Sequence, residues 1–273
     1  MGSWTNPPPA AGILRPENAG ALFELRTAPP PARLGRYVDL FWSVHWSLRA
    51  PQQQPSQVIS YPVVHVTAET GPDRYGHEMP AELVHGVVTR RFDITLSESG
   101  YCYGIRFSPG GFTAITGRPA HPLTDRVERL DAPELAAVHE DPSPGAALEH
   151  LVAAVDSLHT TDDDGPLDMV ATLERDIREN AVTTVADAAA RHGLSERTVQ
   201  RLLRTHVGVG ARWMIRRCRL HDALTELHEN GDVRLADLAV RLGWYDQAHF
   251  TRDFTTAVGI SPHAYVARDP SHR

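Results

Sequence analysis

One segment of this chain occurs twice, fifty residues apart, and this repeat limits the fold more than any other feature. VADAAARHG at residues 185–193 aligns with LADLAVRLG at residues 235–243, with alanine, aspartate, arginine and glycine at equivalent positions. In both copies the glycine is followed by a second stretch of helical periodicity, which ends at Gly208 or at Gly259. A short helix, a glycine turn and a second helix, present in duplicate, predict two helix-turn-helix units.

The second helix of each unit is expected to bury one face and to present the other. Val199 and Leu203 belong to the apolar stripe of the first unit, and two phenylalanines, Phe250 and Phe254, form that of the second. Arginine and glutamine can make paired hydrogen bonds to guanine and adenine edges in the major groove. A charged stripe is usually a solvated helix face, but two copies with arginine at the same register favour DNA binding. The candidate DNA-reading residues are Arg197, Gln200, Arg201, Arg204, Gln247, His249 and Arg252.

The stretch between the two units, residues 210–230, contains no proline and repeats leucine and alanine at helical spacing. It predicts one helix of about twenty residues, about 30 Å long. This length is close to one turn of duplex DNA, about 34 Å, so the helix could place the two units in successive major grooves. Four arginines near its start could contact DNA phosphates or form ordinary surface ion pairs, and the sequence leaves both roles open: Arg212, Arg216, Arg217 and Arg219.

The charge of the chain is divided unevenly between its two halves. Residues 1–165 carry a net charge of −8 and residues 166–273 a net charge of +1, and every Lys or Arg position holds arginine. The acidic first half is a poor surface for DNA, so it should serve another purpose. Between the halves, HTTDDDGPLD is a polar, acidic stretch that suggests a linker with few contacts across it. We therefore predict a first domain over 1–160, a linker over 161–168 and a second domain over 169–273.

These motifs resemble the DNA-binding domain of the AraC/XylS family of transcription regulators. ADLAVRLGWYDQAHFTRDFTTAVGISPHAY is similar to the family signature around the second helix-turn-helix, and ADAAARHGLSERTVQRLLRTHVG is similar to the first. The sequence departs from the family pattern at Ala211, Trp244 and Val266, where proline, phenylalanine and arginine are common. By position, the resemblance assigns DNA contacts to Arg197, Gln200, Arg201, Gln247, Ala248, His249 and Arg252.

The resemblance also implies an N-terminal effector or dimerisation domain, commonly a cupin-like β-barrel. Strand-like patterns agree with it, since YCYGIRF at residues 101–107 alternates between two faces. GIRFSPGGFTAITGRPAHPLTDRVERLD is similar to a segment of actinobacterial regulators of the same family. The predicted fold class is α+β with two domains: a β-rich, cupin-like barrel with helices, and an all-α double helix-turn-helix joined by a long linker helix.

Aromatic residues are concentrated in the predicted strands of the first domain. Tryptophan and tyrosine side chains inside a small barrel can line a pocket for a planar or apolar ligand. They can equally fill the core, and the sequence leaves both interpretations open. The candidate pocket residues are Trp42, Trp46, Tyr61, Tyr101 and Tyr103.

Acidic and histidine side chains in the same region raise an alternative hypothesis, a metal-binding cupin enzyme fused to a DNA-binding module. The residues concerned are His45, His65, His77, His85, Glu69 and Glu78. The tight His-x-His pair of cupin enzymes is absent, so we expect no metal site and no other cofactor. The sequence also holds no nucleophile motif and no nucleotide-binding fingerprint. We therefore assign no catalytic residue and expect a protein that is not an enzyme.

The expected partners are double-stranded DNA, a small-molecule effector, RNA polymerase and a second copy of the chain. An apolar stripe could form the dimer contact or pack inside its own domain, which is the commoner fate of an amphipathic helix. This stripe consists of Leu148, Leu151, Val152 and Val155. No apolar run is long enough to cross a membrane and the N-terminus lacks the features of a signal peptide, so we expect a cytoplasmic protein without membrane contacts.

Overall fold

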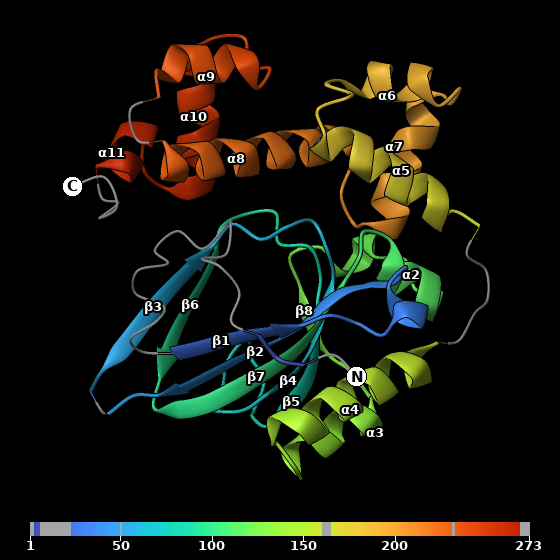
Figure 1. Ribbon diagram of the computed structural model, residues 1–273, viewed down its shortest axis with the longest axis vertical. Helices are drawn as coiled ribbons and strands as arrows, with labels where there is room; N and C mark the ends of the chain where they lie inside the picture. The colour runs from blue at the N-terminus through green and yellow to red at the C-terminus, as the bar shows by residue number, and fades with distance from the viewer. Residues whose placement is uncertain (1–2, 6–22, 50, 160–164, 231–232, 268–273) are drawn as a thin grey trace.

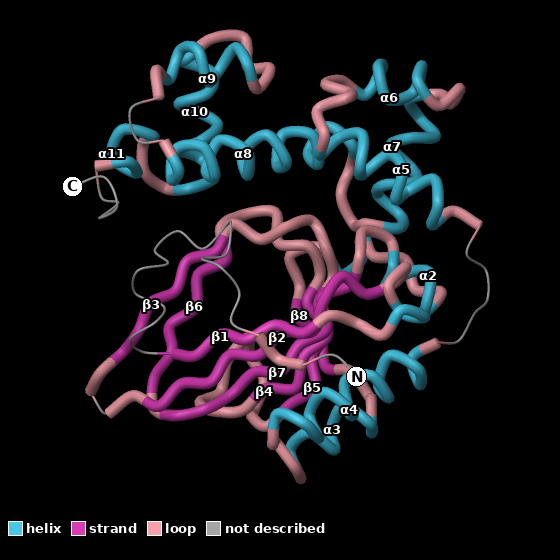
Figure 2. Tube along the Cα trace, in the orientation of Figure 1, coloured by secondary structure: helices cyan, strands magenta, loops and turns pink. Residues whose placement is uncertain are grey.

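A computed structural model describes residues 3–5, 23–49, 51–159, 165–230 and 233–267 of the 273. Strands dominate its N-terminal part and helices make up its C-terminal part (Figure 2). The chain therefore forms a strand-rich domain followed by a helical domain, as the sequence predicts. Residues 161–164, half of the linker predicted over 161–168, lie outside the described residues.

The strands of the N-terminal domain pair into two sheets. Their bounds are β1 (Phe23–Ala28), β2 (Val38–Ser47), β3 (Gln53–Val58), β4 (His65–Glu69), β5 (Ala81–His85), β6 (Phe92–Ser97), β7 (Ser99–Phe107) and β8 (Val127–Arg129). Six of them form an antiparallel sheet in the order β1-β2-β7-β4-β5-β8, and β3 pairs with β6 in a separate two-stranded sheet.

The closed cupin-like barrel expected from the resemblance is not confirmed. The large sheet ends at β1 and β8, and among the described strands these two edges do not pair with each other. β3 and β6 do not close the gap, because among the described strands they pair with one another and not with β1 or β8. The structure therefore supports a strand-rich domain of two sheets.

Strand β7 has the two-faced pattern that its sequence predicts. Tyr103, Ile105 and Phe107 are each 0 % exposed and belong to the main core of the domain. Cys102 lies on the opposite face, in a smaller cluster with Trp46. Successive side chains of a strand point to opposite faces, so one alternating stretch serves both clusters.

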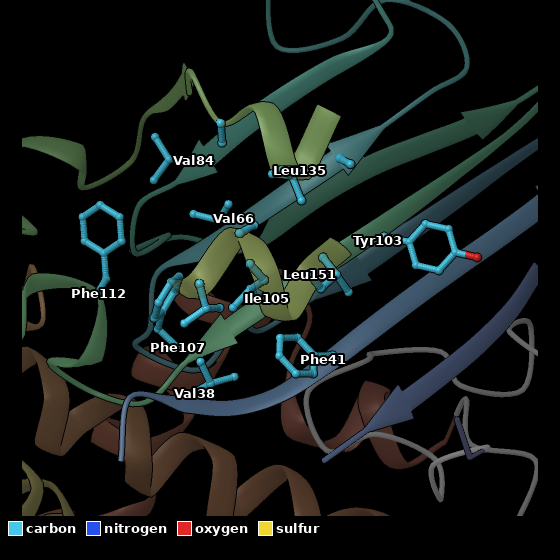
Figure 3. Packing of buried hydrophobic residues seen from close by; sticks show 14 of the residues in the cluster. Val38, Phe41, Val66, Val84, Tyr103, Ile105, Phe107, Phe112, Leu135 and Leu151 are labelled. Atoms are coloured by element: carbon cyan, nitrogen blue, oxygen red, sulfur yellow. The ribbon is translucent and has the colours of Figure 1, made fainter. Parts of the chain in front are cut away.

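Helices cover one face of the large sheet. They are α2 (Gly111–Thr116), α3 (Pro133–Ala136) and α4 (Pro144–Leu158), with short 3-10 turns η2 (Ala32–Leu34), η3 (His121–Leu123) and η4 (Ala137–His139). Figure 3 shows Phe41, Ile105 and Leu151 gathered between the strands and α4. The α4 stripe packs inside its own domain, with Val152 at the edge of the core and three buried members, Leu148, Leu151 and Val155. It therefore does not supply the dimer contact that the sequence left open.

The C-terminal domain contains the two predicted helix-turn-helix units. Its helices are α5 (Leu167–Arg178), α6 (Val185–Arg191), α7 (Glu196–His206), α8 (Ala211–Glu229), α9 (Leu235–Arg241), α10 (Gln247–Val258) and α11 (Pro262–Val266). The first unit is α6 with α7 and the second is α9 with α10, and α8 joins them. In both turns a glycine takes the left-handed conformation, with φ of +64° at Gly193 and +84° at Gly243, where a side chain would be strained.

The two domains pack against each other along α8 (Figure 1). The core of the first unit includes Val87 from the strand-rich domain, and the core of the second includes Ile59. The acidic composition of the linker suggested few contacts between the domains, and the structure corrects this expectation. The contacts are made by loops far from the linker in sequence, which linker composition does not report.

Candidate nucleic-acid interface

Helix α7 presents three arginines to solvent. Ser195 caps its N-terminus, because the side-chain oxygen accepts a hydrogen bond from the backbone N–H of Thr198 at 3.1 Å. Val199 and Leu203, each 0 % exposed, bury the inner face. The outer face carries three exposed side chains that have no hydrogen-bond or ion-pair partner within the described parts of the chain: Arg197, Arg201 and Arg204. Free guanidinium groups in a row are suited to contacts with phosphates and base edges.

Gln200 has a structural contact that the sequence did not reveal. Its Oε1 accepts a hydrogen bond from the backbone N–H of Ala211 at 3.1 Å, at the first residue of α8. The N–H groups of a first helical turn have no partner within their own helix, so this contact satisfies one of them. Gln200 is half-buried between α7 and α8, and the carboxamide NH2 remains as its hydrogen-bond donor.

Helix α10 of the second unit repeats the arrangement with different polar side chains. Asp246 caps it by accepting a hydrogen bond from the backbone N–H of His249 at 2.6 Å. Phe250 and Phe254, both 0 % exposed, anchor the inner face. The side chains of Gln247, Ala248 and Arg252 are exposed, and that of His249 is half-buried.

Asp253 of α10 turns back towards the turn and α8 and not into solvent. Its Oδ2 accepts a hydrogen bond from the indole Nε1 of Trp244 at 3.0 Å, and it lies 3.5 Å from Nε2 of His249 and from Nε of Arg216. The carboxylate therefore ties the turn to α10 and to α8. This explains why the tryptophan at this position has a hydrogen-bond partner in an otherwise apolar core.

One exposed aromatic side chain was missed at this surface. Tyr245 is 90 % exposed and lies in the turn before α10. It is the residue that the second unit gains over the first, between Trp244 and the capping Asp246. That insertion is the signal in the sequence that could have identified it.

Two of the four arginines of α8 make internal contacts, with Arg217 buried and Arg219 half-buried. Arg217 is 4 % exposed, lies 4.6 Å above the ring of Trp213 and donates to the carbonyl oxygen of Thr89 at 2.8 Å. Burial lowers the pKa of Arg217 to about 10. Arg219 donates to the carbonyl oxygens of Gly243 at 2.9 Å and Thr183 at 2.6 Å, and so links the two units.

The other two α8 arginines, Arg212 and Arg216, are exposed and remain candidates for phosphate contacts. The sequence could not divide the four, because their roles depend on which helix face the strand-rich domain covers.

The five candidate pocket residues do not lie together. Trp42 and Trp46 belong to the small cluster on one face of the large sheet, whereas Tyr101 and Tyr103 pack on the opposite face. Tyr61 lies between the domains, where its hydroxyl donates to Glu174 Oε1 of α5 at 2.6 Å. Because side chains along β2 and β7 alternate between the two faces of the sheet, the tryptophans and tyrosines that the sequence placed in one candidate pocket lie on opposite faces.

A buried polar cluster lies on the same face of the sheet as the two tryptophans. Glu69, 3 % exposed, accepts a hydrogen bond from Thr67 Oγ1 at 2.8 Å and lies 2.9 Å from His85 Nε2. Burial raises the pKa of Glu69, but the hydrogen bond with His85 and the charge of Arg74 outweigh it, so the pKa is lowered overall. Glu69 is therefore a buried carboxylate in its charged form.

The histidines of this region do not form a metal site among the described residues. No group of three His, Cys, Asp or Glu side chains is arranged there to hold a metal ion. His65 is a hydrogen-bond partner of Trp42 Nε1 at 3.1 Å, and burial lowers its pKa to about 3.

In the part of the chain that the structure describes, no helix is both long and apolar enough to span a membrane.

Comparison with known proteins agrees with the geometry. The family model described as a helix-turn-helix domain matches residues 188–268, which span both units. The helical domain is an AraC-type helix-turn-helix domain. A second model, described as a domain of unknown function (DUF6597), matches residues 26–129 of the strand-rich domain.

Transcriptional activators are among the proteins to which this chain is similar. The transcriptional activator NphR of Rhodococcus sp is 32 % identical over 192 residues, which cover 66 % of this chain and 53 % of NphR. The HTH-type transcriptional activator RhaR of Yersinia pseudotuberculosis is 29 % identical over 111 residues, which cover 40 % of this chain and 37 % of RhaR. The chain thus spans about half the length of NphR and less of RhaR.

Solved structures show only distant similarity to this chain. ToxT of Vibrio cholerae aligns with a TM-score of 0.42 and 14 % identity over 79 % of this chain and 97 % of that one. The C-terminal domain of AraT, a response regulator of Geobacillus stearothermophilus, aligns with a TM-score of 0.33 and 21 % identity over 35 % of this chain and 81 % of that one.

Proposed function

We propose that this protein is a sequence-specific DNA-binding transcription regulator that reads DNA with α7 and α10. The observation that carries the proposal is the matched position of Arg201 and Arg252. These arginines are equivalent in the two units, both are exposed, and the opposite face of each helix is anchored in a core. The similarity to named transcriptional activators supports the same function. A regulator of this kind would meet its DNA in the cytoplasm.

Loss of either arginine should weaken specific DNA binding. Arg201→Ala and Arg252→Ala should each cost about 1–3 kcal/mol of binding free energy, the usual contribution of a base-reading arginine. The measurement is a titration at fixed salt with a duplex selected from a random library by the full-length protein, and with a scrambled duplex. Arg175→Ala removes the same charge from an exposed position of α5 and serves as the control. If both variants kept full affinity for the selected duplex, α7 and α10 would not be the reading helices.

The remaining candidate residues divide by their surroundings. Arg197 and Arg204 flank Arg201 on α7, and we assign them contacts to phosphates or bases. Gln247 and His249 lie in the first turn of α10, the end of the helix nearest its capping residue. Phosphate contacts can be recognised by measuring affinity at several salt concentrations. Each phosphate contact that is lost reduces the slope of log affinity against log salt concentration by about one.

We further propose that the strand-rich domain binds a small-molecule effector and that it is cupin-like. Support comes from the face of the large sheet where Trp42 and Trp46 lie near the polar cluster around Glu69. A planar or apolar molecule with a polar group would suit this combination. Binding of such an effector should change DNA affinity by up to about a hundredfold, because allosteric coupling is typically 1–3 kcal/mol. Tryptophan fluorescence and DNA affinity, measured together for candidate effectors, test this part of the proposal.

The domain limits and further partners are also proposals. We place the effector domain at 1–160, the linker at 161–168 and the DNA-binding domain at 169–273. We propose RNA polymerase as one partner, because a transcriptional activator requires it. We propose a second copy of the chain as another, which would bind DNA that carries the recognition sequence twice. Sedimentation of the full chain, alone and with the selected duplex, measures whether it self-associates.

A further inference from the structure

A short loop of the strand-rich domain contacts both helix-turn-helix units. This loop, residues 87–91 between β5 and β6, is called the bridging segment below. It begins at Val87, which is 1 % exposed and packs in the core of the first unit with Val199 and Leu203. It ends at Arg91, whose Nη1 donates to the carbonyl oxygen of Val258, the last residue of α10, at 2.7 Å.

The middle of the bridging segment is fixed to α8. Arg217 Nη2 donates to the carbonyl oxygen of Thr89 at 2.8 Å and lies 3.4 Å from those of Val88 and Arg90. Arg217 is nearly fully buried and stacks on Trp213 of the same helix. A buried guanidinium costs free energy where its donors lack partners, and Nη1 of Arg217 has none among the described residues. The bonds from Nη2 offset part of this cost and attach the segment to α8.

The first unit has a further attachment beside the bridging segment. Thr124, just after η3, donates from Oγ1 to the carbonyl oxygen of Gly208 at 2.7 Å. The backbone N–H of Ala120 donates to the carbonyl oxygen of Thr205, near the end of α7, at 2.8 Å. Thr113 of α2 adds a third bond, from its Oγ1 to the carbonyl oxygen of His206 at 3.2 Å. The same end of α7 is therefore held by three hydrogen bonds and by the apolar contact of Val87.

The strand-rich domain thus holds equivalent points of the two recognition helices. Gly208 and Gly259, which follow the ends of α7 and α10, are equivalent in the repeat and both have positive φ. A Cβ at Gly259 would collide with the guanidinium of Arg91. The arginines of the outer faces, Arg201 and Arg252 among them, stay exposed, so the contact does not cover the surface assigned to DNA.

We propose that the bridging segment fixes the relative placement of α7 and α10, with Arg91 and Arg217 as positioning residues. The inference rests on the DNA-binding function proposed above and identifies the contacts that set the relative placement of the two DNA-reading helices. The two units have separate cores, and among the described residues α8, the Arg219 link and the bridging segment connect them. The loop after β3 is a further connection, because Ile59 packs in the second core and Tyr61 donates to Glu174 of α5. A protein held in this way selects DNA in which two subsites have one spacing. One extra base pair moves a subsite by about 3.4 Å and turns it by about 35°.

The test measures how binding depends on the spacing of the two subsites. The full-length protein first selects a duplex from a random library, and footprinting maps the two subsites. Affinity is then measured for the selected duplex and for duplexes with one or two base pairs added or removed between the subsites. Arg91→Ala removes the contact with α10. Arg90→Ala is the matched control, because its side chain is exposed and only its carbonyl oxygen is used.

Arg91→Ala should bind the selected duplex about tenfold more weakly and should lose much less affinity than the wild type when the spacing changes. Arg90→Ala should keep the spacing dependence of the wild type. A general loss of stability would lower affinity for every duplex by the same factor, so only a flatter spacing profile supports a positioning role.

A second variant tests the other end of the contact. Thr124→Val keeps the size of the side chain and removes the hydrogen bond to Gly208, so it should flatten the spacing profile in the same direction. Unchanged spacing profiles in both Arg91→Ala and Thr124→Val would overturn the inference. If the wild type selected no duplex at all, the proposed DNA-binding function would fail first, and the two failures are therefore distinguishable.

Discussion

The two helix-turn-helix units share one layout, but they differ in what surrounds them. The first shares its core with α5, through Val170 and Leu173, and with Val87 of the strand-rich domain. The second has a core closed by the end of α8, by α9 to α11 and by Ile59. The first unit is therefore built into the body of the protein, whereas the second lies at the end of α8. A duplicated sequence can give two units of different stability, because stability comes from neighbours as much as from the repeat.

Their outer faces differ as well. The first unit presents a row of three arginines, whereas the second presents Gln247 and Arg252 beside the exposed Tyr245. An arginine row favours strong attraction to the phosphate backbone, and a mixed polar and aromatic face favours contacts with bases. We expect the first unit to contribute more to the salt dependence of binding than the second.

The largest effect that separates the units should come from their cores. Phe254→Ala should lower the free energy of unfolding of the second unit by about 3–5 kcal/mol, the cost of removing a buried phenylalanine. Because this core is separate from that of the first unit, α9 and α10 should lose hydrogen-exchange protection while α6 and α7 keep theirs. Leu203→Ala in the first unit is the matched variant and should affect the whole protein. Equal loss of protection in both units of Phe254→Ala would mean that they unfold together.

A second difference should appear on acidification. His221 of α8 lies beside the loop that carries Ile59, with Nε2 at 3.4 Å from the carbonyl oxygen of Ser60. Burial lowers the pKa of His221 to about 4, below the ordinary value of 6.5. The unfolded chain therefore takes up the proton first as pH falls. The free energy of unfolding should decrease between pH 6.5 and 4, by up to about 3 kcal/mol for this group.

Acid should therefore loosen the contact of the second unit before that of the first, which is made by the apolar Val87 and by hydrogen bonds of the uncharged Thr124 and Ala120. The measurement is hydrogen exchange of α9 and α10 against α6 and α7 at several pH values. His221→Gln cannot be charged and should show a weaker pH dependence over this window. If the variant and the wild type lost stability in parallel, another group would control the acid response.

The sequence predicted the parts of this structure that depend on local periodicity. The repeat located both helix-turn-helix units, and the helical pattern identified Phe250 and Phe254 as anchors and Arg201 and Arg252 as presented groups. These features follow from spacing along one helix, so neighbours elsewhere in the chain do not change them. The strand alternation of β7 was predictable for the same reason.

Features that depend on contacts between distant segments could not be predicted. Arg217 looks like any other arginine of its cluster, and only the docking of the bridging segment makes it a buried group. Tyr61 was grouped with the barrel aromatics, but the loop after β3 carries it to Glu174 in the other domain. The closed barrel was expected from a family resemblance, and the pairing of β3 with β6 is a long-range choice that strand periodicity does not determine.

The smallest expected effect concerns the first helix of each unit. Helix α6 begins with a capping box, in which Thr184 Oγ1 accepts from the backbone N–H of Asp187 and Asp187 accepts from that of Thr184, both at 3.0 Å. Helix α9 has Arg234 at the same place in the repeat and Asp237 three residues later, and it has no side-chain cap.

Arg234→Thr should rebuild the capping box and raise the free energy of unfolding of the second unit by about 1 kcal/mol. The exposed ion pair of Arg234 with Asp237, 3.7 Å apart, is lost in this variant, but such pairs contribute little. Arg234→Ala loses the same ion pair without gaining a cap, so the difference between the two variants in chemical denaturation isolates the capping box. No difference between them would show that a capping box at this position does not stabilise the second unit.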